Sequence, residues 1–236
     1  EYLYGQHPGV LTHLDLDQAI TGGDAAVAKA NSAAFIQCVG SRIPERPYCS
    51  KMCCTHSLES AVILKESKPE MDVYILYRDL RSYGFREDLY RKAREKGVVF
   101  IRYDLDHPPE VGTEDGKRLS LTVTDHVLGR EILLSPDLLI LASAVIPNEN
   151  KELFEHFKVP VNDEGFLMEA HMKLRPVDFA SDGLFMAGLA HYPKPLDESI
   201  AQAKAAVSRA TTILSKKAIL VGLSLIHISE PTRLRR

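Results

Sequence analysis

The stretch FIQCVGSRIPERPYCSKMCC, residues 35–54, holds all four cysteines of this 236-residue chain. They stand at Cys38, Cys49, Cys53 and Cys54, a spacing of C-x10-C-x3-C-C. Secreted disulfide-rich domains spread their cysteines so that the bridges tie distant loops together. Four cysteines gathered in one short stretch predict instead a metal or redox site in a reducing compartment, which we expect to be the cytoplasm.

The sequence around the cysteines predicts a strand, a turn and a helix. Residues 33–39 (AAFIQCV) are an apolar run followed by Gly40, which is typical of a buried strand that ends in a turn. Residues 50–67 place apolar side chains on one helical face, and a proline follows shortly after. No G-x-G-x-x-G phosphate-binding turn lies between the strand and the helix. We therefore expect the thiols to gather where a nicotinamide dinucleotide would otherwise bind.

The spacing of the thiols favours an iron–sulfur cluster. If the helix begins near Cys49, then Cys49 and Cys53 share one face and Cys54 lies one step round. A loop after the strand can bring Cys38 over the start of that helix, whose positive end favours thiolates. Four thiolates around one point are the ligand set of a 4Fe–4S cluster. Thiol redox chemistry, zinc and unconnected structural thiols remain alternatives, although adjacent cysteines make a poor zinc knuckle.

The rest of the chain predicts an α/β fold with a parallel sheet. After the cysteine helix we expect a strand, a helix and a strand at residues 71–80, 85–97 and 98–104. This β-α-β-α-β order requires crossover connections and therefore parallel strands. Further elements are expected as a hairpin at residues 118–136, strands at 137–148 and 183–190, and helices at 152–159 and 197–217, the last capped by Asp197 or Ser199.

The composition is that of an ordinary globular protein. Hydrophobic residues make up 45% of the chain and charged residues 26%. The net charge of −3 gives no basic footprint for nucleic acid. No run of about 18 apolar residues predicts a membrane span.

Both ends of the sequence suggest that it is a piece of a longer protein. The chain begins at Glu1 rather than at a methionine, and we expect it to be a fragment. Residues 223–233 (LSLIHISEPTR) resemble the in-frame translation of an adapter used to prepare sequencing libraries. We therefore leave residues 223–236 out of the fold prediction as an artefactual tail, with a natural basic tail as the alternative.

Three motifs resemble the A subunit of heterodisulfide reductase and its bacterial relatives. They are the cysteine stretch FIQCVGSR…PYCSKMCC, HMKLRPVDF at residues 171–179, and GLFMAGLAHYPKPLDESIAQAKAAVSRA at residues 183–210. The resemblance covers about residues 4–222. It implies an oxidoreductase subunit with FAD and iron–sulfur clusters that transfers electrons within a complex. It also implies that the four cysteines, Cys38, Cys49, Cys53 and Cys54, bind a 4Fe–4S cluster.

The same resemblance implies a two-dinucleotide-binding flavoprotein of the thioredoxin reductase type. In that fold a Rossmann-like domain is inserted into the FAD-binding domain. Residues 31–150 would be the inserted domain, which carries the cysteine site, and residues 1–30 and 151–222 would be two parts of the FAD-binding domain. The implied partners are other heterodisulfide-reductase-like subunits, with a hydrogenase or a dehydrogenase as a candidate electron donor. Neither nucleic acid nor a direct membrane span is implied.

The motif at residues 183–210 supplies four expected flavin neighbours, namely Gly188, Ala190, Lys194 and Gln202. A glycine lets the backbone approach a cofactor closely, and the N-terminus of the following helix can point its N–H groups at the flavin. Two positions depart from the family pattern. Leu189 replaces the usual acid after the glycine, and Glu59 replaces a lysine near the flavin. An acid at position 59 disfavours a reduced anionic flavin, which argues against electron bifurcation by this member.

Three other functions fit parts of the sequence. A component of a quinone-interacting membrane-bound oxidoreductase would share the folds and the cofactors. A zinc-stabilised interaction module would use the same four thiols, and metal analysis separates it from the iron–sulfur proteins. A nicotinamide-dependent disulfide reductase would need the glycine fingerprint that this sequence lacks.

Overall fold

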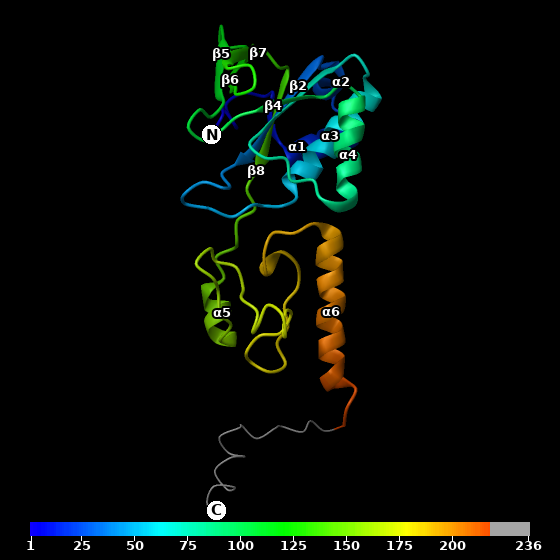
Figure 1. Cartoon of the computed structure of the whole chain (residues 1–236), viewed down its shortest axis with the longest axis vertical. Helices are drawn as coiled ribbons and strands as arrows, with labels where there is room; N and C mark the ends of the chain where they lie inside the picture. Colours follow the sequence, from blue (N-terminus) through cyan, green and yellow to red (C-terminus); the bar gives the residue numbers. More distant parts are fainter. Residues whose placement is uncertain (218–236) are drawn as a thin grey trace, which may run out of the picture. The chain divides into compact units, whose positions relative to one another are not determined.

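The computed structural model describes residues 1–217, which divide into two compact units (Figure 1). The first unit is Glu1–Asn148 together with Pro193–Pro195. The second contains Glu149–Tyr192 and the helix α6 (Leu196–Leu214). The expected artefactual tail lies outside the described residues.

A five-stranded parallel sheet forms the centre of the first unit. Its strands follow the order β1–β8–β2–β3–β4, and β2 (Ser32–Val39) is the middle strand. The others are β1 (Val10–Thr12), β8 (Leu138–Ser143), β3 (Asp72–Tyr77) and β4 (Val99–Arg102). All four neighbouring pairs run parallel, so the predicted parallel sheet is confirmed.

Apolar side chains cover both faces of this sheet. One face packs against helices α1 (His13–Gly22), α3 (Cys53–Ser67) and α4 (Glu87–Glu95). The other packs against an antiparallel meander of β5 (Glu110–Glu114), β6 (Arg118–Asp125) and β7 (Arg130–Leu134). Because successive strand residues point to opposite faces, Phe35 joins the helix-side core and Ile36 the meander-side core.

Residues 1–30 belong to the first unit. Thr12 and Asp15 form a reciprocal capping box at the start of α1, and α2 (Ala25–Lys29) follows. β1 pairs with β8, and Leu16 is fully buried in the helix-side core. The compact units therefore divide after Asn148 and not at residue 30. The expected assignment of residues 1–30 and 151–222 to an FAD-binding domain stays a prediction.

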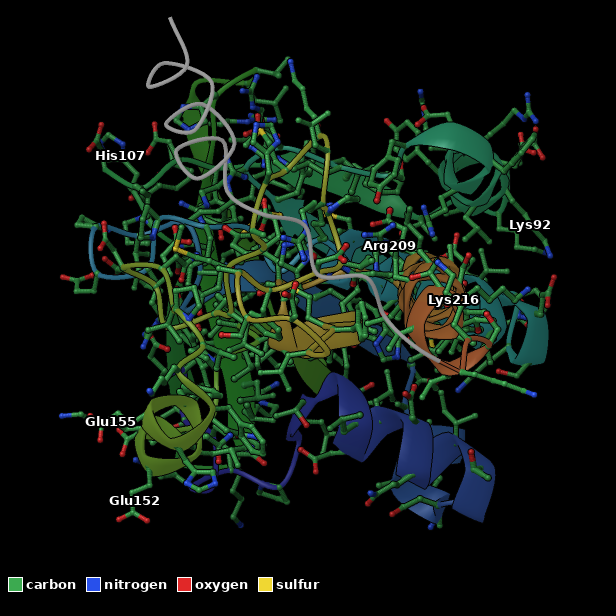
Figure 2. All side chains as sticks on the ribbon, turned by 90° about the horizontal axis from the view of Figure 1, so that it is seen from below. Lys92, His107, Glu152, Glu155, Arg209 and Lys216 are labelled. Atoms are coloured by element: carbon green, nitrogen blue, oxygen red, sulfur yellow. The ribbon has the colours of Figure 1, made fainter. Side chains whose placement is uncertain are left out.

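The second unit holds α5 (Lys151–Phe157), the 3-10 turn η2 (Gly188–Ala190) and α6. Glu152 and Glu155 point outward from α5 (Figure 2). Asp178 is 2% exposed and accepts hydrogen bonds from Arg209 Nε at 3.1 and 3.2 Å, which ties the irregular chain to α6. The charge of this buried carboxylate is thus paired.

Two expectations for this unit were wrong. The strand predicted at residues 183–190 is absent, because this stretch makes one isolated bridge, Asp178 with Phe185, and then η2. An apolar run needs a neighbouring strand to form a ladder, and the described chain provides none here. The last helix begins at Leu196, so Asp197 and Ser199 lie within its first turn rather than at its cap.

Within residues 1–217, no helix combines the length and the apolar character that crossing a bilayer demands.

Two phenylalanines test the assignment of the core. Phe35 is fully buried in the helix-side core, whereas Phe85 is 97% exposed. Phe35→Ala is expected to lower the free energy of unfolding by about 3–5 kcal/mol, because it leaves a cavity in packed core. Phe85→Ala is expected to change it by less than about 0.5 kcal/mol. Urea unfolding followed by circular dichroism measures both, and equal losses would contradict this core.

Candidate metal centre at the start of α3

The four cysteines come from β2, the loop after it and the start of α3. Cys38 lies near the end of β2, Cys49 lies in the loop, and Cys53 and Cys54 open α3. All four are free thiols; Cys53 and Cys54 are buried, and Cys38 and Cys49 are half-buried. The expectation that the helix begins near Cys49 was wrong. Lys51 has a φ of +62°, which an α-helix does not accept, so the helix starts after it.

A bulge at the end of β2 redirects Cys38. The pairing of β2 with β8 is regular as far as Ile36 with Leu141, but then Val39 pairs with Ser143. β2 therefore contains one residue more than β8 over this step. Cys38 has a φ of +62°, a left-handed conformation that costs a non-glycine residue about 1–2 kcal/mol. Bulges of this kind re-aim side chains next to functional sites.

The loop after β2 lies over the carboxyl ends of β2 and β8. Tyr48 donates its hydroxyl to Val145 O at 3.0 Å, and Val145 N donates to Ser50 Oγ at 2.9 Å. Arg46 Nε donates to Gly40 O at 2.5 Å. Between β2 and β8 the order of strands reverses, which is where open parallel sheets bind ligands. This loop, residues 40–52 and called the cysteine loop below, thus occupies the position of a phosphate-binding turn.

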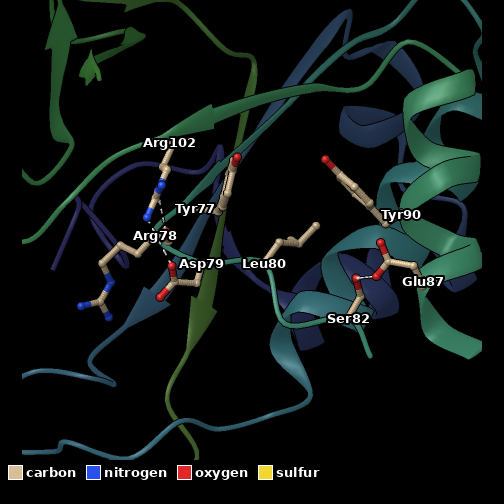
Figure 3. A pocket seen from close by; sticks show the side chains of 8 residues that line it. All are labelled: Tyr77, Arg78, Asp79, Leu80, Ser82, Glu87, Tyr90 and Arg102. Atoms are coloured by element: carbon tan, nitrogen blue, oxygen red, sulfur yellow. Dashed lines mark hydrogen bonds and ion pairs between the residues drawn. The ribbon is translucent and has the colours of Figure 1, made fainter. Parts of the chain in front are cut away.

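Charged side chains that follow β3 and end β4 also contact the cysteine loop or its ion pair. Arg42 Nη1 lies 3.8 Å from Cys38 Sγ, and Arg42 Nη2 lies 2.5 Å from Asp79 Oδ2. Arg102 also pairs with Asp79, at 3.5 Å, in a pocket of about 340 Å³ (Figure 3). The buried Arg78 donates to two carbonyl oxygens of the loop at 2.7 and 2.8 Å. These contacts fix the backbone beside Cys38.

The thiols are close enough to influence one another electrostatically. Burial raises the pKa of Cys53 to about 12, and the charges of Cys54, Cys38 and Cys49 contribute to this increase. Burial likewise raises the pKa of Cys54 to about 11, with smaller contributions from Cys38 and Cys49. A group that binds these thiolates must therefore displace protons and provide positive charge in their place.

The start of α3 offers N–H groups to an anionic group. Met52, the residue before the helix, makes no side-chain capping hydrogen bond. The first N–H groups of a helix have no partner within it, and they carry partial positive charge. These N–H groups would offset part of the cost of burying the thiolates of Cys53 and Cys54 when a group binds there.

The donor set of four thiols suits an iron–sulfur cluster. Within residues 1–217, no three His, Cys, Asp or Glu side chains converge closely enough to hold an ion. A tetrahedral zinc site with Zn–S distances of about 2.3 Å requires such convergence. In a 4Fe–4S cluster each thiolate binds a different iron, so its four thiols stand further apart. Four free thiols from β2, the loop after it and the start of α3 supply that number of ligands.

The structure brings three of the four expected flavin neighbours together. Gly188 N donates to Gln202 Oε1 at 2.9 Å, and Gly188 has a φ of +73°, which favours glycine. Ala190 lies at the end of the same turn, η2. Lys194 is buried and belongs to the first compact unit, whereas Gly188, Ala190 and Gln202 belong to the second.

Sequence reasoning missed two residues beside the expected flavin position. His191 Nε2 lies 2.8 Å from Glu169 Oε2, and His191 Nδ1 lies 2.7 Å from the amide nitrogen of Gln202. Glu169 therefore orients His191, which orients Gln202. Glu59, in contrast, is exposed on α3. Its effect on a flavin stays a prediction.

Comparison with curated proteins gives a consistent set of relatives. A protein of Methanopyrus kandleri, named as the second iron–sulfur A subunit of CoB–CoM heterodisulfide reductase, is 36% identical over 245 aligned residues, which cover 98% of this chain and 37% of the relative. The iron–sulfur A subunit of CoB–CoM heterodisulfide reductase from Methanocaldococcus jannaschii is 37% identical over 224 residues, which cover 88% of this chain and 34% of the relative.

The chain is homologous to a region of the heterodisulfide reductase A subunit. It spans about a third of the length of these relatives. A third relative, the A subunit of the H(2):CoB–CoM heterodisulfide,ferredoxin reductase of Methanothermobacter marburgensis, is 36% identical over 230 residues, covering 92% of this chain and 34% of the relative. No family model matches the chain. The predicted resemblance is thus confirmed.

Solved structures share the fold of this chain. Thioredoxin reductase of T. acidophilum superposes with a TM-score of 0.54 at 13% identity, covering 87% of this chain and 56% of that protein. An NAD-dependent persulfide reductase of A. fulgidus gives a TM-score of 0.52 at 18% identity, covering 92% of this chain and 37% of that protein. The expected thioredoxin-reductase-like fold is confirmed.

The ion pair beside Cys38 makes a testable prediction for pH dependence. The hydrogen bond from Arg42 holds the pKa of Asp79 below its ordinary value of 3.8. A carboxylate with a lowered folded-state pKa stabilises the fold above pH 3.8, and this contribution is lost as pH falls through the folded-state pKa. Arg42→Gln is expected to raise the pKa of Asp79 toward 3.8, measured by carbon NMR titration of the carboxyl group.

The control for this titration is Arg91→Gln, which removes an exposed arginine paired with Asp88 on α4. It should leave the titration of Asp79 unchanged. If Arg42→Gln also leaves it unchanged, the ion pair does not form in solution.

Proposed function

We propose that this chain is part of an electron-transferring iron–sulfur flavoprotein subunit, and that Cys38, Cys49, Cys53 and Cys54 hold a 4Fe–4S cluster. The observation that carries the proposal is the gathering of four free thiols over the strand-order reversal, at an uncapped helix start. Relatives that match most of this chain are named as iron–sulfur subunits. On this proposal the whole protein is an oxidoreductase.

The cluster and FAD would supply the redox chemistry, while the protein supplies placement and electrostatics. The start of α3 would direct N–H groups at the cluster, and Arg42 would place a positive charge beside Cys38. Both effects favour the more negatively charged state of a bound group and so raise its reduction potential. Buried Cys53 and Cys54 would keep water away from two of its corners.

The proposed flavin contacts are Gly188, Ala190, Lys194 and Gln202. The left-handed glycine of η2 would let backbone approach FAD closely. Gln202 is held through His191, so its amide is oriented before any cofactor binds. The solved reductase structures support only the architecture, because their identity to this chain is 13% and 18%.

We further propose that the protein works in the cytoplasm with other heterodisulfide-reductase-like subunits. Four free thiols suit a reducing compartment. A hydrogenase or a dehydrogenase is the candidate electron donor, as the name of the marburgensis relative includes H(2). A component of a quinone-interacting oxidoreductase would need the same site, and only its partners would differ. A zinc module would use the same four thiols, but the adjacent cysteines Cys53 and Cys54 make a poor zinc knuckle.

Electron paramagnetic resonance tests the cluster. After anaerobic reconstitution with iron and sulfide, the dithionite-reduced chain is expected to show a 4Fe–4S signal that Cys53→Ser abolishes or alters. Thr55→Ser is the matched control, since it keeps a hydroxyl next to the site. Metal analysis should find iron with acid-labile sulfide. Zinc without sulfide would establish the zinc module instead, and an unchanged signal in Cys53→Ser would remove this residue from the site.

Binding of nicotinamide nucleotides tests the replacement of the phosphate turn. The cysteine loop covers the position where a Rossmann unit holds the pyrophosphate, and no G-x-G-x-x-G turn is present. We therefore expect no tight binding of NADH or NADPH to this chain in calorimetry. A dissociation constant in the low micromolar range, about −8 kcal/mol, would contradict this expectation.

A further inference from the structure

Gln37 is a buried polar residue that the proposed function does not explain. It immediately precedes Cys38 within the bulge of β2, and its side chain is fully buried. Its carboxamide oxygen has no hydrogen-bond partner within residues 1–217. A buried amide that is only partly satisfied is unfavourable for stability, and an apolar side chain would pack at less cost. Its presence therefore calls for another reason.

Two hydroxyl groups hold Gln37 from opposite sides of the sheet. Tyr103, which follows β4, donates its hydroxyl to Gln37 O at 2.6 Å. Gln37 Nε2 donates to Ser57 Oγ on α3, on the helix side. The carbonyl and the carboxamide of one bulge residue are thus both fixed, and this double clamp leaves the backbone at Gln37 little freedom to rotate.

A third buried group, the imidazole of His13, orients the hydroxyl of Ser57. His13 Nε2 lies 2.7 Å from Ser57 Oγ, and His13 stacks on His56 with ring centroids 4.4 Å apart. Burial lowers the pKa of His13 to about 3, so the ring is neutral and can accept the hydroxyl proton of Ser57. Ser57 Oγ is then free to accept from Gln37. Burial also raises the pKa of Tyr103, which keeps its hydroxyl protonated as a donor.

The clamp joins the two chain segments that carry three of the four thiols. Gln37 is the neighbour of Cys38, and Ser57 lies one helical turn after Cys53. A shift of the bulge would move Cys38 away from the start of α3, since Cys38 is held in a left-handed conformation that an unrestrained cysteine avoids. Arg42 contacts the thiol of Cys38 itself but comes from the loop, not from the sheet.

We propose that Gln37 is a positioning residue, and that its hydrogen bonds to Tyr103 and Ser57 hold the bulge of β2 so that Cys38 faces the thiols at the start of α3. The proposal rests on the proposed function only for the identity of the bound group. The arrangement of the thiols can be measured on the metal-free chain.

The experiment follows alkylation of each cysteine by iodoacetamide in the metal-free, reduced 236-residue chain, quantified by mass spectrometry of peptides. Gln37→Met keeps the length of the side chain without the amide, and Tyr103→Phe removes one hydroxyl. Each is expected to speed alkylation of Cys38 about fivefold, the factor that one ordinary hydrogen bond contributes to a conformational equilibrium. Alkylation of buried Cys53 and Cys54 should be unchanged.

Ser57→Ala and Ser60→Ala form a matched pair. Both serines are buried on α3, and only Ser57 touches Gln37. Ser57→Ala should speed alkylation of Cys38, and Ser60→Ala should not. If Ser60→Ala has the same effect, or if alkylation of all four cysteines becomes faster in every variant, the substitutions destabilise the whole fold. The proposal is then wrong. Unchanged rates at Cys38 in both Gln37→Met and Tyr103→Phe would also overturn it.

Reconstitution separates this proposal from the proposed function. With iron and sulfide, Gln37→Met is expected to weaken iron retention about 10-fold, the loss typical of residues that orient metal ligands. If the parent chain binds no iron but the alkylation pattern is as expected, the proposed cluster is wrong and the positioning role stands. If the parent chain binds iron and Gln37→Met retains it equally, the positioning role is wrong.

Discussion

The extra residue at the end of β2 is the constraint on which the site depends. β2 is the central strand, paired with β3 on one side and β8 on the other, so its backbone is fixed along most of its length. If β2 had continued without the bulge, the side chain of Cys38 would have followed the regular alternation of side chains between the two faces of the sheet. The bulge instead gives it a left-handed conformation and starts the loop that crosses to α3. This loop carries Cys49 and leads to Cys53 and Cys54 at the start of α3.

Much of the first unit could be predicted from the sequence, because its elements are strongly patterned. The apolar run before Gly40, the helix after the cysteines and the β-α-β-α-β order all lead to a parallel sheet, which the structure has. The four cysteines could be singled out by spacing alone. The start of α3 could not, because Lys51 is an ordinary residue whose positive φ is imposed by the loop around it.

Other features depend on contacts between distant segments, which no local pattern reveals. β1 is three residues long and is a strand only because β8 lies beside it. The stretch at 183–190 has the apolar pattern of a strand but no ladder partner in the described chain. Tyr103 and Gln37 are far apart in sequence, and nothing local marks the bond between them. The cysteines could be recognised in the sequence because clustered cysteines are rare. The residues that position Cys38 could not, because tyrosine, glutamine and serine are common.

Arg78 gives the cysteine loop a property that bears on electron transfer. Its guanidinium is buried and holds two carbonyl oxygens of the loop, and an arginine side chain stays charged over the whole pH range in which proteins function. The two hydrogen bonds from Arg78 to the loop therefore do not depend on protonation, unlike the Arg42–Asp79 ion pair. A permanently charged side chain bonded to two backbone oxygens would restrict rearrangement of the loop when a bound group gains or loses one electron. On the proposed function, small rearrangement on charge transfer would favour rapid exchange of single electrons, and the two hydrogen bonds from Arg78 to backbone oxygens would contribute to it.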